Sequence, residues 1–339
     1  MRYLPLGPTG VLVSELCLGT MTFGEGWGFG GIDEAQADAL VGRAMEAGVN
    51  FFDTADMYSE GNSEVLLGKA LGRDGRRDKI VLATKAFGRM GASANDAGLS
   101  RYHLVRACEA SLSRLGTDRI DLYQVHGWDA LTPVEETVRA LDDLVRSGKV
   151  LYVGLCNYAA WQIALALGKA DLGGRARFVS AQMYYSLVGR DLEHEVVPLC
   201  QHEGLAILPW SPLAGGFLSG KYRRDQERHP EGSRFATSKF GEFPPVDKDR
   251  GFAVVEHLIA MAASHRTTPS TIALKWLLTK PGVTSVIVGV RKMEQLEANL
   301  AAASLELPAE ALAALDALTA TAEAYPNWMI RRQGQNRVI

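Results

Sequence analysis

The sequence predicts a (β/α)8 barrel of the TIM type, and three observations support this prediction. Short apolar runs of strand character alternate along the chain with runs of helical character, which is the pattern of a parallel sheet covered by helices. There are eight strand candidates, and eight is the number that closes such a barrel. The length suits one large domain, so we expect a single domain over residues 1–339. A doubly wound open sheet is the alternative, and it would usually use fewer strands.

The elements are expected in a regular order after an N-terminal β-hairpin at residues 3–14, whose turn is Gly7–Gly10. We expect strands at Leu16–Gly19, Val49–Phe52, Ile80–Thr84, Leu122–Val125, Leu151–Leu155, Val179–Met183, Leu205–Pro209 and Val286–Val288. We expect the intervening helices at Asp33–Ala47, Asn62–Leu71, Arg101–Leu115, Pro133–Ser147, Trp161–Lys169 and Leu192–Glu203. Glycine follows several of these helices, as it does at many helix C-caps.

Two segments depart from the repeating pattern. The stretch from Ser211 to Asp249, after the seventh strand, is long, charged and interrupted by glycine and proline. A connection of that length indicates a loop that works on a ligand. Beyond the eighth strand, Met293–Ser304 and Ala309–Leu318 are expected as extra C-terminal helices.

Composition argues against several classes of protein. The formal net charge is −3, with acidic and basic residues interspersed, so we expect no nucleic-acid partner and no membrane-surface partner. The four cysteines are widely spaced, which indicates neither a disulfide framework nor a zinc site. The first residues lack the apolar region of a signal peptide, and no apolar run approaches membrane-spanning length. We therefore expect a cytoplasmic protein.

Polar or aromatic side chains lie where the strands end, and in a barrel these ends form the mouth that holds the catalytic groups. In chain order they are Asp53, Lys85, His126, Asn157, Gln182, Trp210 and Ser211. A carboxylate, an ammonium, an imidazole and two amides in corresponding positions are hard to explain by packing alone. We interpret them as one functional site.

A glycine-rich segment, Gly26–Gly31, offers a competing interpretation because it matches the G-x-G-x-x-G pattern of dinucleotide-binding folds. That fingerprint needs its turn directly after the strand. Here Met21–Glu25 separate the glycines from the first strand. We therefore interpret the segment as a loop at the rim of the barrel.

Four motifs resemble those of a known family, and the resemblance covers nearly the whole chain. They are Asp53-Thr54-Ala55-Asp56-Met57-Tyr58, Thr84-Lys85, Tyr123-Gln124-Val125-His126 and Trp210-Ser211-Pro212-Leu213-Ala214-Gly215-Gly216. They strongly resemble the aldo-keto reductases, and among these the bacterial members related to the potassium-channel β subunits. The resemblance implies reversible reduction of an aldehyde, ketone or keto-sugar to an alcohol by NADPH, without a metal.

The resemblance also implies a role for each of four residues. Tyr58 would be the general acid that protonates the carbonyl oxygen. Lys85 would lower the pKa of Tyr58, because a nearby ammonium favours the phenolate. Asp53 would hold Lys85 in place, and His126 would hydrogen-bond the carbonyl and orient it.

The family's cofactor contacts map onto residues at the same end of the barrel. They are Gly19, Thr20, Met21 and Asp53 near the nicotinamide ribose, Cys156, Asn157 and Gln182 at the carboxamide, Trp210 on the nicotinamide face, Ser211, Leu213, Gly215, Lys221, Ser233 and Arg234 at the pyrophosphate, and Gly289, Arg291, Gln295 and Asn299 at the adenosine phosphate. The basic pair Arg291 and Lys292 favours NADPH over NADH, since guanidinium groups pair well with phosphate. One position departs from the family: Ala298 stands where a glutamate commonly contacts adenine.

Substrate choice is expected to depend on aromatic residues of the rim loops, an apolar lining typical of ligand pockets. The candidates are Trp27, Phe29, Phe87, Trp128 and Trp328. Two other functions stay open: a regulatory subunit that holds NADPH with little turnover, and a metal-dependent barrel hydrolase, for which only His126 and Asp53 qualify. The partner expected is a small carbonyl or alcohol substrate, and a homo-oligomer is also allowed.

Overall fold

The computed structural model describes residues 1–25, 28, 31–226 and 228–335. Its main sheet has eight parallel strands in the order β10-β3-β4-β5-β6-β7-β8-β9. They are β3 (Leu16–Gly19), β4 (Phe51–Asp53), β5 (Val81–Ala86), β6 (Ile120–Val125), β7 (Val150–Cys156), β8 (Phe178–Tyr184), β9 (Ala206–Trp210) and β10 (Val286–Gly289). Ile207 of β9 closes the ring, because it exchanges backbone hydrogen bonds with Gly282 and Thr284, just before β10.

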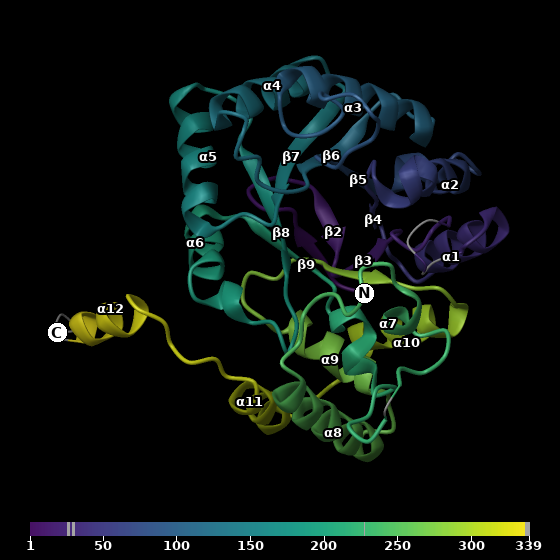
Figure 1. Cartoon of the computed structure of the whole chain (residues 1–339), viewed down its shortest axis with the longest axis vertical. Coiled ribbons are helices and arrows are strands. Elements are labelled where there is room, and N and C mark those ends of the chain that lie inside the picture. The colour runs from purple at the N-terminus through teal and green to yellow at the C-terminus, as the bar shows by residue number, and fades with distance from the viewer. Residues whose placement is uncertain (26–27, 29–30, 227, 336–339) are drawn as a thin grey trace.

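Helices surround the barrel on the outside, except for the last one, which stands apart (Figure 1). The surrounding helices are α1 (Glu34–Glu46), α2 (Asn62–Leu71), α3 (Arg101–Leu115), α4 (Val134–Arg146), α5 (Ala160–Leu172), α6 (Val196–Glu203), α7 (Arg234–Thr237), α8 (Lys248–Ser264), α9 (Pro269–Leu278), α10 (Met293–Ser304) and α11 (Ala309–Leu318), and the last helix is α12 (Asn327–Gly334). The predicted (β/α)8 barrel is confirmed, with all eight expected strands present. None of the described helices is both long enough and apolar enough to cross a membrane.

The helices α8 and α9 fall where no helix was predicted. In α9 the side chains from Thr271 to Leu274 are buried, as are those of residues 276–278. A helix buried nearly all round lacks the one-sided period by which a surface helix is recognised. Its start nevertheless follows the rules, because the Thr268 side chain caps it and Pro269 occupies its first turn.

The N-terminal hairpin closes the bottom of the barrel. Its strands β1 (Tyr3–Pro5) and β2 (Leu12–Ser14) pair antiparallel, and the side chains of Leu6 and Val13 pack among the inward-facing side chains of the strands. The backbone at Gly7 has φ +58°, and a Cβ there would lie 2.1 Å from the Val179 carbonyl oxygen. Only glycine allows the turn to approach the barrel so closely.

The barrel interior is apolar toward this closed end. The side chains of the strands that fill it are buried and pack together, and they are those of Cys17, Phe51, Ala83, Leu122, Val179, Ala206, Leu208 and Ile287. We call this set the floor. Filling of the interior by side chains is the usual design of such barrels, so the chemistry is confined to the opposite end, where the strands finish.

Candidate active site

Five inward-facing side chains above the floor come from five adjacent strands. They are Asp53 of β4, Lys85 of β5, Gln124 of β6, Cys156 of β7 and Gln182 of β8, all buried. We call this set the polar layer. On the remaining side of the mouth, β3 and β10 end in Gly19 and Gly289, which lie opposite each other and present no side chain there.

Lys85 links the two acidic groups of the site. Its Nζ donates to Asp53 Oδ2 at 2.5 Å, to the Thr54 carbonyl at 2.7 Å and to the Tyr58 hydroxyl at 3.2 Å. The Lys85 side chain is fully buried, and a buried charge needs such partners. The structure thus brings Lys85 together with Asp53 and Tyr58, which lie about 30 residues before it in the sequence.

Protonation follows from these contacts. Burial by itself lowers the pKa of Lys85, but the negative charge of Asp53, with a smaller contribution from Tyr58, outweighs it and raises that pKa above its ordinary value. Burial raises the pKa of Tyr58, and the ammonium of Lys85 offsets only part of the increase. The net shift for Tyr58 is therefore opposite to the expected one: in this arrangement the phenol keeps its proton, which is the form that a general acid needs.

His126 lies beside the phenol. The two rings meet edge to face, with centroids 5.7 Å apart. Burial lowers the pKa of His126 well below its ordinary value, and the charge of Lys85 acts in the same direction. The imidazole is therefore neutral, and its buried Nδ1 has no hydrogen-bond partner among the described residues.

Two glutamines bind the second oxygen of Asp53. Gln124 Nε2 donates to Oδ1 at 3.1 Å and Gln182 Nε2 donates to the same oxygen at 2.9 Å. Gln124 was not predicted as a site residue, although it stands within one of the quoted motifs. A polar residue inside an apolar strand, two positions before the histidine at its end, was the signal that could have found it.

The Asn157 side chain, expected at the carboxamide, has hydrogen-bond partners on both sides. The Asn157 amide donates to the His126 carbonyl at 3.0 Å, and Asn157 Oδ1 accepts from Trp210 Nε1 at 2.9 Å. Trp210 stacks on Phe243 of the long loop, with ring centroids 5.8 Å apart. Cys156 lies lower, where its thiol contacts Gln124 Oε1 at 3.8 Å.

Strained backbone is concentrated around this mouth. Among the described residues, five non-glycine positions with positive φ lie in its loops: Ser59, Glu60, Asn157, Ser211 and Ala214. Each costs free energy and persists only where the surrounding structure enforces it, which is typical of functional sites. The first two directly follow Tyr58 and therefore fix the loop that carries the phenol.

The long loop after β9 forms a basic cradle. Gly215 and Gly216 have φ of +68° and +90°, and a Cβ on Gly216 would lie 2.8 Å from Lys221 Nζ. Burial lowers the pKa of Lys221, and so do the nearby positive charges of Arg291 and Arg234. Three cations so close together are characteristic of a site for an anion.

The other predicted cofactor contacts come from the ends of β3, β9 and β10 and from α10. Arg291 donates from its side chain to the Gly232 carbonyl at 2.8 Å, and its backbone N–H donates to Gln295 Oε1 at 2.8 Å. The Thr20 hydroxyl donates to the Asp53 carbonyl at 3.1 Å, and Met21 follows it in the chain. In the long loop, Ser211 Oγ accepts from the backbone N–H of Gly215 at 3.1 Å. The remaining predicted contacts are Leu213 and Ser233 of that loop and Asn299, which is buried on α10.

The predicted substrate residues are not all in one place. Trp128 meets Tyr158 and Trp161 edge to face, at 5.2 and 5.6 Å between centroids, and Phe87 is half-buried at the end of the neighbouring strand. Trp328 lies on α12, which stands apart from the barrel (Figure 1). Trp27 and Phe29 lie outside the described residues, as do Gly26 and Gly30 of the same glycine-rich segment.

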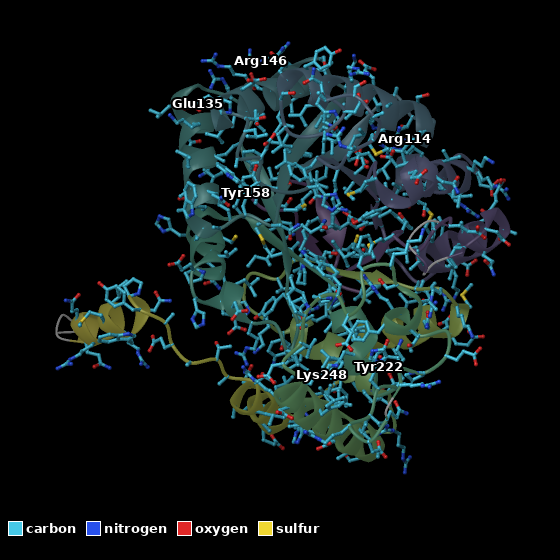
Figure 2. All side chains as sticks on the ribbon, in the orientation of Figure 1. Arg114, Glu135, Arg146, Tyr158, Tyr222 and Lys248 are labelled. Carbon is cyan, nitrogen blue, oxygen red and sulfur yellow. The ribbon has the colours of Figure 1, made fainter. Side chains whose placement is uncertain are left out.

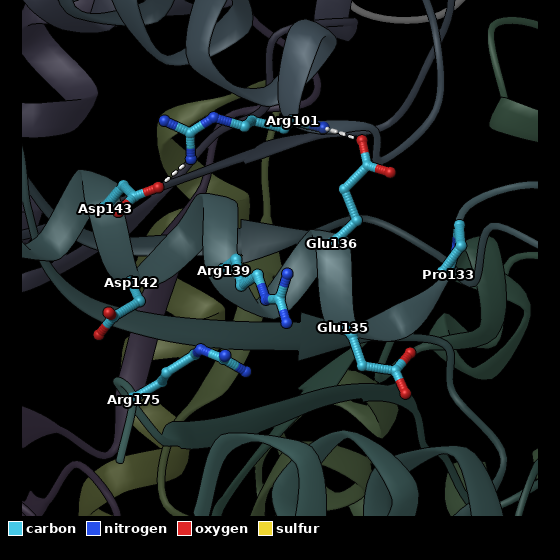
Figure 3. A pocket seen from close by; sticks show the side chains of 8 residues that line it. All are labelled: Arg101, Pro133, Glu135, Glu136, Arg139, Asp142, Asp143 and Arg175. Atoms are coloured by element: carbon cyan, nitrogen blue, oxygen red, sulfur yellow. Dashed lines mark hydrogen bonds and ion pairs between the residues drawn. The ribbon is translucent and has the colours of Figure 1, made fainter. Parts of the chain in front are cut away.

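A surface hollow on the outer side of α4 is separate from the strand ends (Figure 3). Charges of both signs line it; Arg101 contacts Asp143 and donates from its backbone to Glu136. Such half-exposed charges are common on the solvated face of a helix. Within the described part of the chain, no cluster of His, Cys, Asp or Glu is placed to hold a metal ion.

A second group of buried charges lies behind the site, between the barrel and its helices. Arg114 of α3, labelled in Figure 2, donates to Glu64 of α2 at 2.6 Å, and Glu64 also accepts from the Thr84 hydroxyl at 2.5 Å. Nearby Asp56 is buried, and neither of its carboxyl oxygens has a hydrogen-bond partner among the described residues. Burial and the charge of Glu64 raise the pKa of Asp56 to about 7.

Comparison with known proteins agrees with this geometry. The chain is 38% identical over 326 residues to the uncharacterized oxidoreductase YrpG of Bacillus subtilis, covering 93% of this chain and 95% of that protein. It is 38% identical over 309 residues to norsolorinic acid reductase stcV of Emericella nidulans, covering 89% and 77%. It is 36% identical over 306 residues to a probable voltage-gated potassium channel subunit beta of Arabidopsis thaliana, covering 89% and 91%. The model of the Aldo/keto reductase family matches residues 15–320, and the chain belongs to that family.

Proposed function

We propose that this protein is an NADPH-dependent reductase of aldehydes, ketones or keto-sugars, acting reversibly, with Tyr58 as the general acid. The family and its oxidoreductase relatives support carbonyl reduction in general. The observation that carries the finer proposal is the placement of Lys85 Nζ, 2.5 Å from Asp53 Oδ2 and 3.2 Å from the Tyr58 hydroxyl. A carboxylate, an ammonium and a phenol joined by hydrogen bonds in this order form a proton-donating unit.

Each member of the unit has one task. Tyr58 holds a proton at its hydroxyl because burial raises its pKa, and it passes that proton to the carbonyl oxygen. Lys85 stabilises the phenolate left behind, since the ammonium is 3.2 Å away. Asp53 keeps Lys85 charged and oriented. His126, neutral through burial and the charge of Lys85, can donate a hydrogen bond to the same carbonyl oxygen and orient it.

The residues around the mouth fit a dinucleotide phosphate. Gly216 leaves a cradle that a Cβ would fill, and Lys221, Arg234 and Arg291 surround it with positive charge. These side chains would hold the phosphates, and Trp210 with Asn157 and Gln182 would hold the nicotinamide. NADPH, when bound, supplies the hydride. The guanidinium of Arg291 suits a 2′-phosphate, so we propose NADPH as the preferred cofactor over NADH.

The test compares two variants of the whole protein with the wild type. Tyr58→Phe removes the acidic proton and keeps the ring, so turnover should fall by about a thousandfold or more while the affinity for NADPH stays close to that of the wild type. Lys221→Ala should do the reverse, weakening NADPH binding by about tenfold with the proton donor intact. Cofactor consumption with a panel of aldehydes, ketones and keto-sugars gives turnover, and quenching of tryptophan fluorescence gives affinity.

Two results would contradict the proposal. Near-normal turnover in Tyr58→Phe would show that another group is the acid. If the wild-type protein binds NADPH but consumes none with any carbonyl compound, a regulatory subunit that holds the cofactor is the better description, and one relative is indeed named a probable channel subunit.

A further inference from the structure

We propose that Gln124 is a positioning residue for proton transfer: it fixes the carboxylate of Asp53, and through it the ammonium of Lys85 beneath Tyr58. This inference rests on the proposed function, because it concerns the same proton donor. Gln124 is buried at the centre of the polar layer, on β6. It lies opposite Lys85 of β5 on one side and opposite Gly154 of β7 on the other.

The hydrogen bonds of Gln124 define the orientation of its amide. Nε2 donates to Asp53 Oδ1 at 3.1 Å, and Oε1 accepts from Gln182 Nε2 at 3.2 Å. With the amide reversed, its oxygen would face the carboxylate and its NH2 would face another NH2, so both contacts would be repulsive. The Cys156 thiol adds a weak contact to Oε1, at 3.8 Å.

These bonds leave Asp53 one orientation. Oδ1 accepts from Gln124 and Gln182, while Oδ2 accepts from Lys85. Donors on both oxygens hold the plane of the carboxylate, and this plane sets the direction in which the ammonium points. Gln182 donates to Gln124 as well as to Asp53, so removing the Gln124 amide also removes the acceptor that orients the Gln182 amide toward Asp53. The two amides act as one clamp.

The neighbouring strand is built to leave room for this side chain. A Cβ on Gly154 would lie 3.0 Å from Gln124 Cγ and 2.5 Å from Ser180 Oγ. The contacts of Gln124 are with Asp53, Gln182 and Cys156, below the mouth. It is therefore placed to act through Asp53 rather than by touching substrate. Gln182 differs, since it is also proposed to hold the cofactor.

The experiment uses Gln124→Met, which keeps the size of the side chain and removes both hydrogen bonds. Turnover should fall by about tenfold, while NADPH affinity, measured by fluorescence quenching, stays unchanged. A displaced ammonium stabilises the phenolate less, so the pKa of Tyr58 should rise. In the direction of alcohol oxidation, which needs the phenolate, the acid limb of the rate profile should therefore move to higher pH.

The matched control is Tyr123→Phe. Tyr123 is the neighbouring residue of β6 and packs outside the barrel, and its buried hydroxyl has no hydrogen-bond partner among the described residues. This variant should keep both the turnover and the pH limb of the wild type. A loss of turnover in Gln124→Met with the pH limb in its wild-type position would overturn the proposal, because that pattern indicates a packing role only.

Two further outcomes are decided in advance. If Gln124→Met does not fold, Gln124→Asn is measured instead, since it keeps an amide but withdraws it by one methylene, and an unmoved limb there overturns the proposal equally. The underlying function fails by a different result, namely a wild-type protein without turnover or a Tyr58→Phe variant that retains it. The two failures are therefore distinguishable.

Discussion

On β4, β5 and β6 the polar layer and the floor are only two residues apart, yet they do opposite work. Side chains two positions apart on a strand point to the same side, so three of the polar residues stand directly above apolar ones: Asp53 above Phe51, Lys85 above Ala83, and Gln124 above Leu122. Removing the apolar side chains of the floor from water stabilises the folded state. Burying the polar side chains of the layer costs hydration, and only the hydrogen bonds among them compensate for that cost.

The difference teaches where substitution should affect stability and where it should affect chemistry. Phe51 in the floor has apolar neighbours that any side chain of similar volume could satisfy. Lys85 in the layer has partners at 2.5, 2.7 and 3.2 Å that only a cation with those hydrogens could satisfy. Changes in the floor should therefore unfold the protein, and paired changes in the layer should inactivate it without unfolding it.

Lys85→Met should have the largest effect of any change in the polar layer, because it should lower both turnover and stability. Turnover should fall by about a thousandfold, because the phenolate of Tyr58 loses its counter-charge. Stability should fall as well, by about 3–5 kcal/mol, because Asp53 is left buried and unpaired. The double variant Asp53→Asn/Lys85→Met removes both charges, so it should recover most of the free energy of unfolding and none of the activity.

Urea unfolding and turnover measured on the same preparations check this prediction. The control is the single variant Asp53→Asn, which leaves the buried ammonium without its carboxylate. If the double variant is no more stable than Lys85→Met alone, the unpaired carboxylate of Asp53 is not the cause of the lost stability, and the prediction is wrong.

Phe51→Ala is the corresponding change in the floor. It removes a fully buried ring and should lower the free energy of unfolding by about 3–5 kcal/mol through lost burial and the cavity left behind. Turnover per folded molecule, measured well below the unfolding midpoint, should stay at the wild-type level. A variant of normal stability with low turnover would show that floor and layer are coupled.

The same contrast explains what the sequence could predict. The alternation of short apolar runs with helical runs located all eight strands, and the polar residues at the ends of the strands indicated Asp53 and Lys85, because the ends of parallel strands share one edge. Tyr58 and its role came from the resemblance. Gln124 was missed, since a polar residue within a strand shows its purpose only when its partners on β4 and β8 are known.

Other features depend on contacts that no local pattern contains. The pKa of Tyr58 was expected to be lowered by Lys85, but burial has the larger effect, and burial is a property of the folded chain. Likewise, the resemblance implied that Trp210 stacks on a nicotinamide, but it could not predict that Trp210 stacks on Phe243, 33 positions later in the chain, because that contact depends on the path of the long loop.

Asp56 gives the smallest expected effect and tests whether burial without partners is costly outside the layer. Its pKa is about 7 in the folded protein, raised by burial and by Glu64 from an ordinary value near 3.8. Between these values the folded state retains a proton that the unfolded state has released, so the free energy of unfolding falls as the pH rises, by at most about 4 kcal/mol spread over the whole interval. Asp56→Asn cannot ionise, so its stability should lack this decline and should exceed that of the wild type at about pH 8.

Urea unfolding at a series of pH values measures the difference between Asp56→Asn and the wild type. Asp118→Asn, at a side chain 90% exposed, is the control, and its stability should depend on pH as that of the wild type does. Parallel curves for Asp56→Asn and the wild type would mean that the Asp56 carboxyl finds a partner in solution.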